Sequence, residues 1–125
     1  MTDSVRRLHA AIKQARTADP ARSRTAKLFG GGMPRIAKKV AEEAVEVGIA
    51  ALQGQRREAI LESADLIYNL AALWTAMGIE PEEIWDELDR REQLYGIAEK
   101  LPKTRSPDRL KAQQRMKLTI GSSAG

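Results

Sequence analysis

The sequence contains no cysteine and a single histidine, His9, among its 125 residues. Without cysteine the chain forms no disulfide and offers no thiolate ligand to a metal. A zinc site normally takes several histidine or cysteine ligands, so one histidine does not suggest such a site, nor a Ser-His-Asp triad. His9 falls in the first predicted helix, where we expect it to face solvent.

Aromatic residues make up only 4% of the chain, so the core must be built from Ala, Leu, Ile and Val. This composition suits packed helices better than sheets, which favour β-branched and aromatic residues. The sequence also lacks an apolar run of the roughly 18 residues that a membrane span needs. Its first residues lack the apolar block of a signal peptide, so we expect a cytoplasmic protein without membrane contact.

The net charge of +4 is unevenly distributed. Residues 102–125 contain six basic residues and one acidic residue, whereas residues 1–101 contain fifteen basic and sixteen acidic residues. We therefore predict a single domain over residues 1–101 and a basic, partly disordered tail over 102–125. A basic tail can contact nucleic acid, but solvated charged tails are common, and we do not expect nucleic acid to be a partner.

Hydrophobic periodicity, capping residues and breakers predict an all-α fold, an antiparallel bundle of four main helices plus a short one. The loops between the second, third and fourth main helices are short, so neighbours should pack antiparallel. Three glycines, Gly30 to Gly32, are expected to break the chain before the second main helix. The predicted main helices cover 3–18, 33–53, 56–77 and 81–93, with the short helix over 23–29 and a weak one over 109–118.

The second main helix places a carboxylate in the middle of its apolar face. At about 100° per residue, one stripe of that helix is formed by Ile36, Val40, Val47, Ala50 and Ala51. Glu43 falls within this stripe, Glu46 lies at its edge and Glu42 lies further round. An unpaired carboxylate in an apolar environment is destabilising by several kcal/mol, by order of magnitude, so Glu43 requires an explanation.

The third main helix repeats this anomaly. It is apolar nearly all round, which is typical of a central, buried helix. Glu62 and Asp65 interrupt it three residues apart and therefore share a face, and Asn69 follows one turn later on the same side. No Lys or Arg occurs from Glu58 to Asp89, so these acids have no basic partner on their own helix.

Across two antiparallel helices, Glu43, Glu46, Glu62 and Asp65 can converge. Their mutual repulsion would be strongly unfavourable unless a divalent cation neutralised it, and oxygen ligands favour Mg²⁺, with Mn²⁺ as an alternative. Magnesium also takes phosphate ligands, which predicts a site that holds a polyphosphate beside an activated water. The proton acceptor would be Glu42 or an incompletely coordinated carboxylate such as Glu43. The rival interpretation is a salt-bridged core using arginines of the first helix.

Phosphates also need positive groups. Arg35, Lys38 and Lys39 lie in the first turns of the second main helix, where free N–H groups and the helix dipole favour anions. Lys27 lies just before the glycine run. We assign these four residues and Asn69 to substrate binding. The glycine run lacks the Gly-Lys-Ser/Thr spacing of a Walker motif and is weak evidence by itself.

Two stretches resemble phosphoribosyl-ATP pyrophosphatase of histidine biosynthesis, a branch of the MazG-like all-α nucleotide pyrophosphatases. The first combines Ser23-Arg24-Thr25-Ala26-Lys27-Leu28 with the Ile36–Glu46 segment, and the second is Glu62–Leu70. Glu42-Glu43-x-x-Glu46 followed by Glu62-x-x-Asp65 matches the paired superfamily signature. The resemblance implies magnesium held by Glu43, Glu46, Glu62 and Asp65, hydrolysis of phosphoribosyl-ATP to phosphoribosyl-AMP and pyrophosphate, and a homodimer or higher homo-oligomer.

Two other functions remain open from the sequence. A house-cleaning pyrophosphatase for nucleoside triphosphates would share the same metal ligands and differ only in substrate. A non-enzymatic helical interaction module would not need the carboxylates and would depend instead on residues 102–125.

Overall fold

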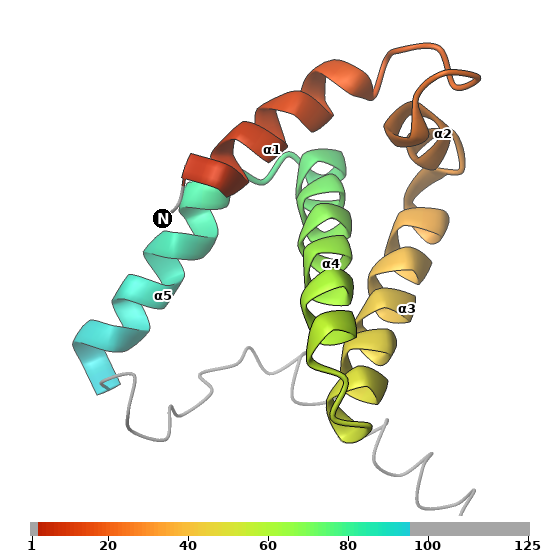
Figure 1. The fold of residues 1–125 in the computed structure, drawn as a ribbon. Helices are drawn as coiled ribbons and strands as arrows, with labels where there is room; N and C mark the ends of the chain where they lie inside the picture. Colours follow the sequence, from red (N-terminus) through yellow and green to blue (C-terminus); the bar gives the residue numbers. More distant parts are fainter. Residues whose placement is uncertain (1–2, 96–125) are drawn as a thin grey trace, which may run out of the picture. The chain divides into compact units, whose positions relative to one another are not determined.

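The computed structural model describes residues 3–95, and within them every secondary-structure element is a helix (Figure 1). The predicted all-α class is therefore confirmed. The described chain forms two compact units that divide between Asp86 and Glu87, within the last helix. The proposed tail, with its weak helix over 109–118, lies outside the described residues. The helices are α1 (Asp3–Ala15), α2 (Arg24–Gly30), α3 (Gly32–Leu52), α4 (Arg56–Met77) and α5 (Pro81–Tyr95).

Helices α3 and α4 form an antiparallel hairpin and run side by side from their short connecting loop (Figure 1). Gly54, with φ of +66°, turns the chain after α3, and Gly78, with φ of +70°, ends α4. A left-handed backbone conformation of this kind favours glycine, because glycine has no Cβ. The amide of Ile79 also bonds the carbonyl oxygen of Trp74 at 2.8 Å, which completes the helix end. The predicted limits of α4 are confirmed.

One predicted helix boundary is wrong, and one predicted break is narrower than expected. Helix α1 ends at Ala15 and not at residue 18, because a turn precedes Asp19 and Pro20, and the residue before a proline avoids the helical conformation. The break predicted within the glycine run is present but narrower than expected, since Gly30 belongs to α2 and Gly32 starts α3 with φ of +75°. The connection between α2 and α3 is therefore a single residue, Gly31.

The core lies where α1, α2 and α3 meet the C-terminal half of α4. Its buried residues are Ile12, Leu28, Ile36, Ala71 and Ala72. The two alanines are fully buried, and their small side chains leave room for neighbouring helices to approach. This junction holds α2 against one end of the α3–α4 hairpin.

The prediction that His9 faces solvent is wrong. His9 is only 4% exposed, because it lies within one turn of Ile12 on the buried face of α1. Its Nδ1 atom lies 3.6 Å from an Oε2 atom of Glu80. Lys13 also contacts Glu80, at 2.6 Å, so this carboxylate joins α1 to the segment that follows α4.

The N-terminal part of α4 is more exposed than the prediction of a central, buried helix implied. Ile60, Leu61 and Ile67 are between 42% and 44% exposed. The prediction holds for the C-terminal half, where Ala71, Ala72 and Thr75 are buried. None of the described helices combines the length and the hydropathy that crossing a membrane requires.

Candidate active site

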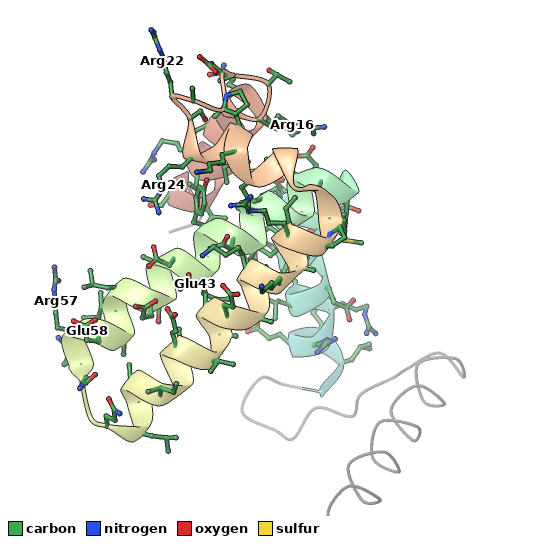
Figure 2. The ribbon with its side chains drawn as sticks, turned by 90° about the vertical axis from the view of Figure 1, so that its right-hand side faces the viewer. Arg16, Arg22, Arg24, Glu43, Arg57 and Glu58 are labelled. Atoms are coloured by element: carbon green, nitrogen blue, oxygen red, sulfur yellow. The ribbon has the colours of Figure 1, made fainter. Side chains whose placement is uncertain are left out.

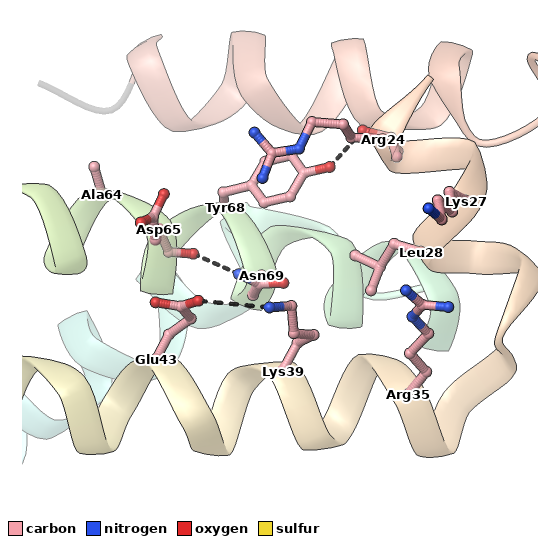
Figure 3. A pocket seen from close by; sticks show the side chains of 11 residues that line it. Arg24, Lys27, Leu28, Arg35, Lys39, Glu43, Ala64, Asp65, Tyr68 and Asn69 are labelled. Carbon is pink, nitrogen blue, oxygen red and sulfur yellow. Dashed lines mark hydrogen bonds and ion pairs between the residues drawn. The ribbon is translucent and has the colours of Figure 1, made fainter. Parts of the chain in front are cut away.

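Three carboxylates from α3 and α4 meet on the inner face of the hairpin. Glu43 comes from α3, whereas Glu62 and Asp65 come from α4, and one oxygen atom from each lies within 4.8 Å of the others. Figure 3 shows Glu43 and Asp65 extending toward one another from the two helices. Antiparallel packing produces this meeting, since it sets the middle of α3 opposite the first half of α4.

The surroundings of these carboxylates suit a bound cation. Glu43 is only 8% exposed, and its Oε2 atom and that of Glu62 are buried without a hydrogen-bond partner in the described part of the chain. A buried carboxylate oxygen without a partner is costly, whereas a hard cation satisfies it directly. Among residues 3–95, no arginine forms an ion pair with these acids, which removes the salt-bridged alternative. The donor set is entirely oxygen, which fits magnesium or manganese.

Glu46 forms a fourth member at the edge of this group. It does not join the three closest carboxylates, but it lies next to Glu62 across the hairpin. The pKa of Glu62 is raised from 4.5 to about 7, most strongly by the neighbouring carboxylate of Glu46 and then by that of Glu43. Burial and the negative charges of the same neighbours act in the same direction. Like charges are therefore held close together, as the helical wheels predicted.

The lysines and Glu42 are arranged along the next turn of α3. Lys39 lies between the two glutamates, with its Nζ atom 3.9 Å from Glu43 Oε1 and 3.7 Å from Glu42 Oε2. The structure places Glu42 on the exposed side of the helix, where Lys38 also approaches it at 3.9 Å. Glu42 thus lies outside the group of three carboxylates.

A cavity of about 770 Å³ adjoins the carboxylates, a size typical of small-molecule sites (Figure 3). Four of the five residues assigned to substrate binding line it, and Lys38 does not. Its charge is divided: the acids are at one end and the bases lie further along α3 and on α2. The lining residues are Arg24, Thr25, Lys27, Leu28, Arg35, Lys39, Glu43, Ala64, Asp65, Tyr68 and Asn69.

Specific hydrogen bonds hold the walls of this cavity. The Ser23 hydroxyl accepts a hydrogen bond from the Ala26 amide at 3.1 Å and caps α2. The hydroxyls of Thr25 and Tyr68 are hydrogen-bonded to each other and connect α2 to α4. The amide nitrogen of Asn69 donates to the Asp65 backbone carbonyl oxygen at 2.8 Å, which fixes its orientation.

Sequence reasoning did not assign Arg24, Thr25 or Tyr68 to the site. Tyr68 lies three residues after Asp65, so helical spacing alone would have placed it on the same face. Arg24 and Thr25 could not be placed, because their approach depends on how α2 packs onto the hairpin. That packing is a tertiary property with no local periodic signal.

Comparison with known proteins identifies relatives of the whole described domain. Residues 5–92 match the family described as phosphoribosyl-ATP pyrophosphohydrolase. "Phosphoribosyl-ATP pyrophosphatase 2" of Rhodopseudomonas palustris is 57% identical over 105 residues, covering 84% of this chain and 80% of the relative. The protein of the same name in Bradyrhizobium diazoefficiens is 54% identical, covering 83% and 78%. "Phosphoribosyl-ATP pyrophosphatase" of Azospirillum brasilense is 49% identical, covering 75% and 85%.

Proposed function

Because this chain belongs to the phosphoribosyl-ATP pyrophosphohydrolase family, we propose that it hydrolyses phosphoribosyl-ATP to phosphoribosyl-AMP and pyrophosphate. This is a step of histidine biosynthesis, and we place it in the cytoplasm. Water adds to the α-phosphorus while the oxygen bridging to the β-phosphorus departs with pyrophosphate. The enzyme is therefore a hydrolase that acts on a phosphoric anhydride.

The observation that supports this proposal is the meeting of Glu43, Glu62 and Asp65 beside a cavity with a basic far end. We propose that these carboxylates, with Glu46 at the edge, hold magnesium, and that manganese can replace it. When bound, such a cation neutralises phosphate charge and activates a water. The partnerless oxygens of Glu43 and Glu62 support this assignment.

The basic residues and Asn69 orient the substrate. Lys39 lies next to the carboxylates and Arg35 one turn further along α3, so both can contact the phosphate chain as it leaves the acidic end. Lys27 and Asn69 complete the contacts on the opposite wall, and Lys38 adds positive charge from the exposed side.

We propose that the proton of the attacking water passes to a carboxylate of α3, Glu42 or Glu43. The place of Glu43 in the group of three carboxylates, where the water would be activated, supports Glu43 as the acceptor. Glu42 already has two lysines beside it at the surface, which supports a secondary role in holding those lysines toward the phosphates.

A direct assay tests the reaction. Purified protein with magnesium and phosphoribosyl-ATP should release one pyrophosphate per phosphoribosyl-AMP formed, and removing the metal with a chelator should stop the release. A parallel panel of nucleoside triphosphates tests the house-cleaning alternative. Turnover of those triphosphates without turnover of phosphoribosyl-ATP would reject the proposed substrate.

We also propose that the protein assembles as a homodimer or a higher homo-oligomer. Val45, Ile49 and Leu52 follow helical spacing on one face of α3 and are 60%, 48% and 90% exposed. Ile60 and Ile67 of α4 are also more than 40% exposed. Exposed apolar residues in such a pattern are typical of a surface covered by another subunit, and another copy of this chain is the proposed cover.

A further inference from the structure

A second cavity lies beside the first turn of α2 and the residues that precede it. It has a volume of about 460 Å³ and is lined by Arg22, Arg24 and Lys27 together with Pro20, Ala21 and Ser23. Arg24 and Lys27 also line the first cavity, so the two cavities share a wall. Arg22, by contrast, lines only the second cavity, which has no acidic residue in its lining.

The bases around this cavity have no acidic partner among residues 3–95. Within residues 3–95, none of Arg22, Arg24 and Lys27 forms an ion pair or a side-chain hydrogen bond. Arg24 and Lys27 lie three residues apart on α2 and so share one face. Other basic residues, such as Arg6 and Lys13, are paired with carboxylates. Three uncompensated positive charges around one cavity favour an anionic ligand.

The substrate supplies such an anion. Phosphoribosyl-ATP has a triphosphate at one end. At the other end, a second ribose attached to the adenine ring carries a monophosphate. A phosphate monoester carries between about −1.5 and −2 charges at neutral pH, and arginine binds it through two parallel N–H···O bonds. ATP lacks this second phosphate, and the adenine end of ATP carries no charge.

We infer that the second cavity binds the monophosphate of the phosphoribosyl arm, with Arg22 and Arg24 selecting phosphoribosyl-ATP over ATP. This inference rests on the proposed function, since it assigns the other end of the same substrate. In this arrangement the triphosphate lies at the acidic end of the first cavity. Arg35, which lines the same cavity, stands eight residues from Glu43, or about 12 Å along α3. Arg24, in the shared wall, sits where the arm passes from one cavity to the other.

Two variants and a matched control test this assignment. Arg22→Ala removes a base that lines only the second cavity, and Arg24→Ala removes one from the shared wall. Arg57→Ala removes an arginine at the opposite end of the hairpin and serves as the control (Figure 2). For each protein, kcat/KM is measured with phosphoribosyl-ATP and with ATP in magnesium. In parallel, calorimetry measures Kd for phosphoribosyl-AMP and for AMP, which differ only by the phosphoribosyl arm.

Wild type should bind phosphoribosyl-AMP at least about 10-fold more tightly than AMP, and Arg22→Ala should abolish most of this difference. The same variant should lower kcat/KM for phosphoribosyl-ATP by about 10- to 100-fold and leave any activity on ATP within about twofold. Arg57→Ala should change neither quantity.

Equal losses with both substrates would show that these arginines serve the triphosphate, and no loss would show that the cavity is not used; either result overturns the inference. The proposed function fails separately, if wild type releases no pyrophosphate from phosphoribosyl-ATP. The calorimetric comparison still decides the inference in that case, because it requires no turnover. A wild-type protein that binds AMP and phosphoribosyl-AMP equally would also overturn it.

Discussion

Glu46 of α3 and Glu62 of α4 lie next to each other across the hairpin, and the Glu46 carboxylate is the largest cause of the raised pKa of Glu62. Carboxylates this close repel one another when both are charged, and a proton or a cation between them relieves that repulsion. The arrangement therefore connects the stability of the fold to the occupant of the site.

Magnesium should stabilise the folded protein. A cation that binds the folded chain and not the unfolded chain adds about 2.7 kcal/mol at a concentration 100 times its Kd. Thermal denaturation followed by circular dichroism across a magnesium titration should show Tm rising steadily. In Glu43→Gln the rise should be lost or strongly reduced. A Tm that does not change with magnesium in wild type would contradict the site.

In the absence of metal, stability should fall as pH rises from about 4.5 to about 7. The pKa of Glu62 is about 7 in the folded protein and 4.5 ordinarily, so the folded chain holds a proton that the unfolded chain has released in this window. Because the folded state binds more protons there, the free energy of unfolding decreases with pH. Urea denaturation in chelator at several pH values measures it. Glu62→Gln should flatten this part of the profile.

Magnesium affinity should change with pH in the opposite sense. The cation needs the deprotonated carboxylate of Glu62, so binding should tighten as pH rises to about 7 and level off above it. Calorimetric titration of magnesium between pH 5.5 and 8.5, conditions chosen to bracket about pH 7, measures this directly. An affinity that weakens over that rise would mean that Glu62 does not take part.

The two adjacent glutamates of α3 should differ in their effect on catalysis. Glu43→Gln keeps the shape of a buried side chain but removes its charge, and kcat should fall by about 10²- to 10⁴-fold. Glu42→Gln alters a surface residue paired with lysines, and the loss should be about 10-fold or less. Pyrophosphate release at saturating substrate and magnesium distinguishes them. A larger loss in Glu42→Gln than in Glu43→Gln would move the proton acceptor to Glu42.

Much of this site was predictable from the sequence because the relevant signals are periodic. Glu43 on an apolar stripe, and Glu62 with Asp65 on a second one, required only helical spacing and the length of the loop between the helices. The limits of α4 followed from Gly54 and Gly78, whose positive φ angles end helices locally.

The parts that were missed depend on tertiary packing. His9 looked like a surface residue because polar side chains usually are, yet its place on the α1 stripe buries it beside Glu80. Arg24 joined the site only because α2 continues into α3 through the single residue Gly31 and folds back onto the hairpin. No periodic pattern in the sequence predicts how α2 is oriented on the hairpin.

Gly31 should matter for the position of Arg35. A Cβ added at Gly31 would collide with the Arg35 side chain, which lies directly over it. The far end of the Arg35 side chain can rotate away, but its Cβ is fixed to the backbone of α3. Gly31→Ala should therefore displace the Arg35 side chain from the cavity and shift the first turn of α3, raising KM for phosphoribosyl-ATP several-fold. Gly48→Ala, in open space on the same helix, is the control and should leave KM unchanged. An unchanged KM in Gly31→Ala would show that Arg35 does not need its present position.

Removing the hydroxyl of Tyr68 should loosen the attachment of α2. Tyr68→Phe leaves the Thr25 hydroxyl without its partner, and the buried position of Thr25 makes this cost about 1 kcal/mol of unfolding free energy. KM should rise while kcat changes little, because the carboxylates are untouched. Urea denaturation and steady-state kinetics together test this. Thr25→Val should reproduce both effects, and the double variant should add little, as expected when two residues share one bond.

The proposed assembly predicts that charge on the exposed face of α3 will separate the subunits. Ile49→Glu combined with Leu52→Glu places two carboxylates among residues that are 48% and 90% exposed in the single chain. Loss of an interface hot spot costs about 2 kcal/mol or more, so the dissociation constant should rise by about 30-fold or more. Light scattering after size-exclusion chromatography over a range of concentrations measures this. Ala44→Glu adds charge off that face and should keep the wild-type mass. If wild type itself runs as a monomer at every concentration, the exposed apolar face serves another purpose.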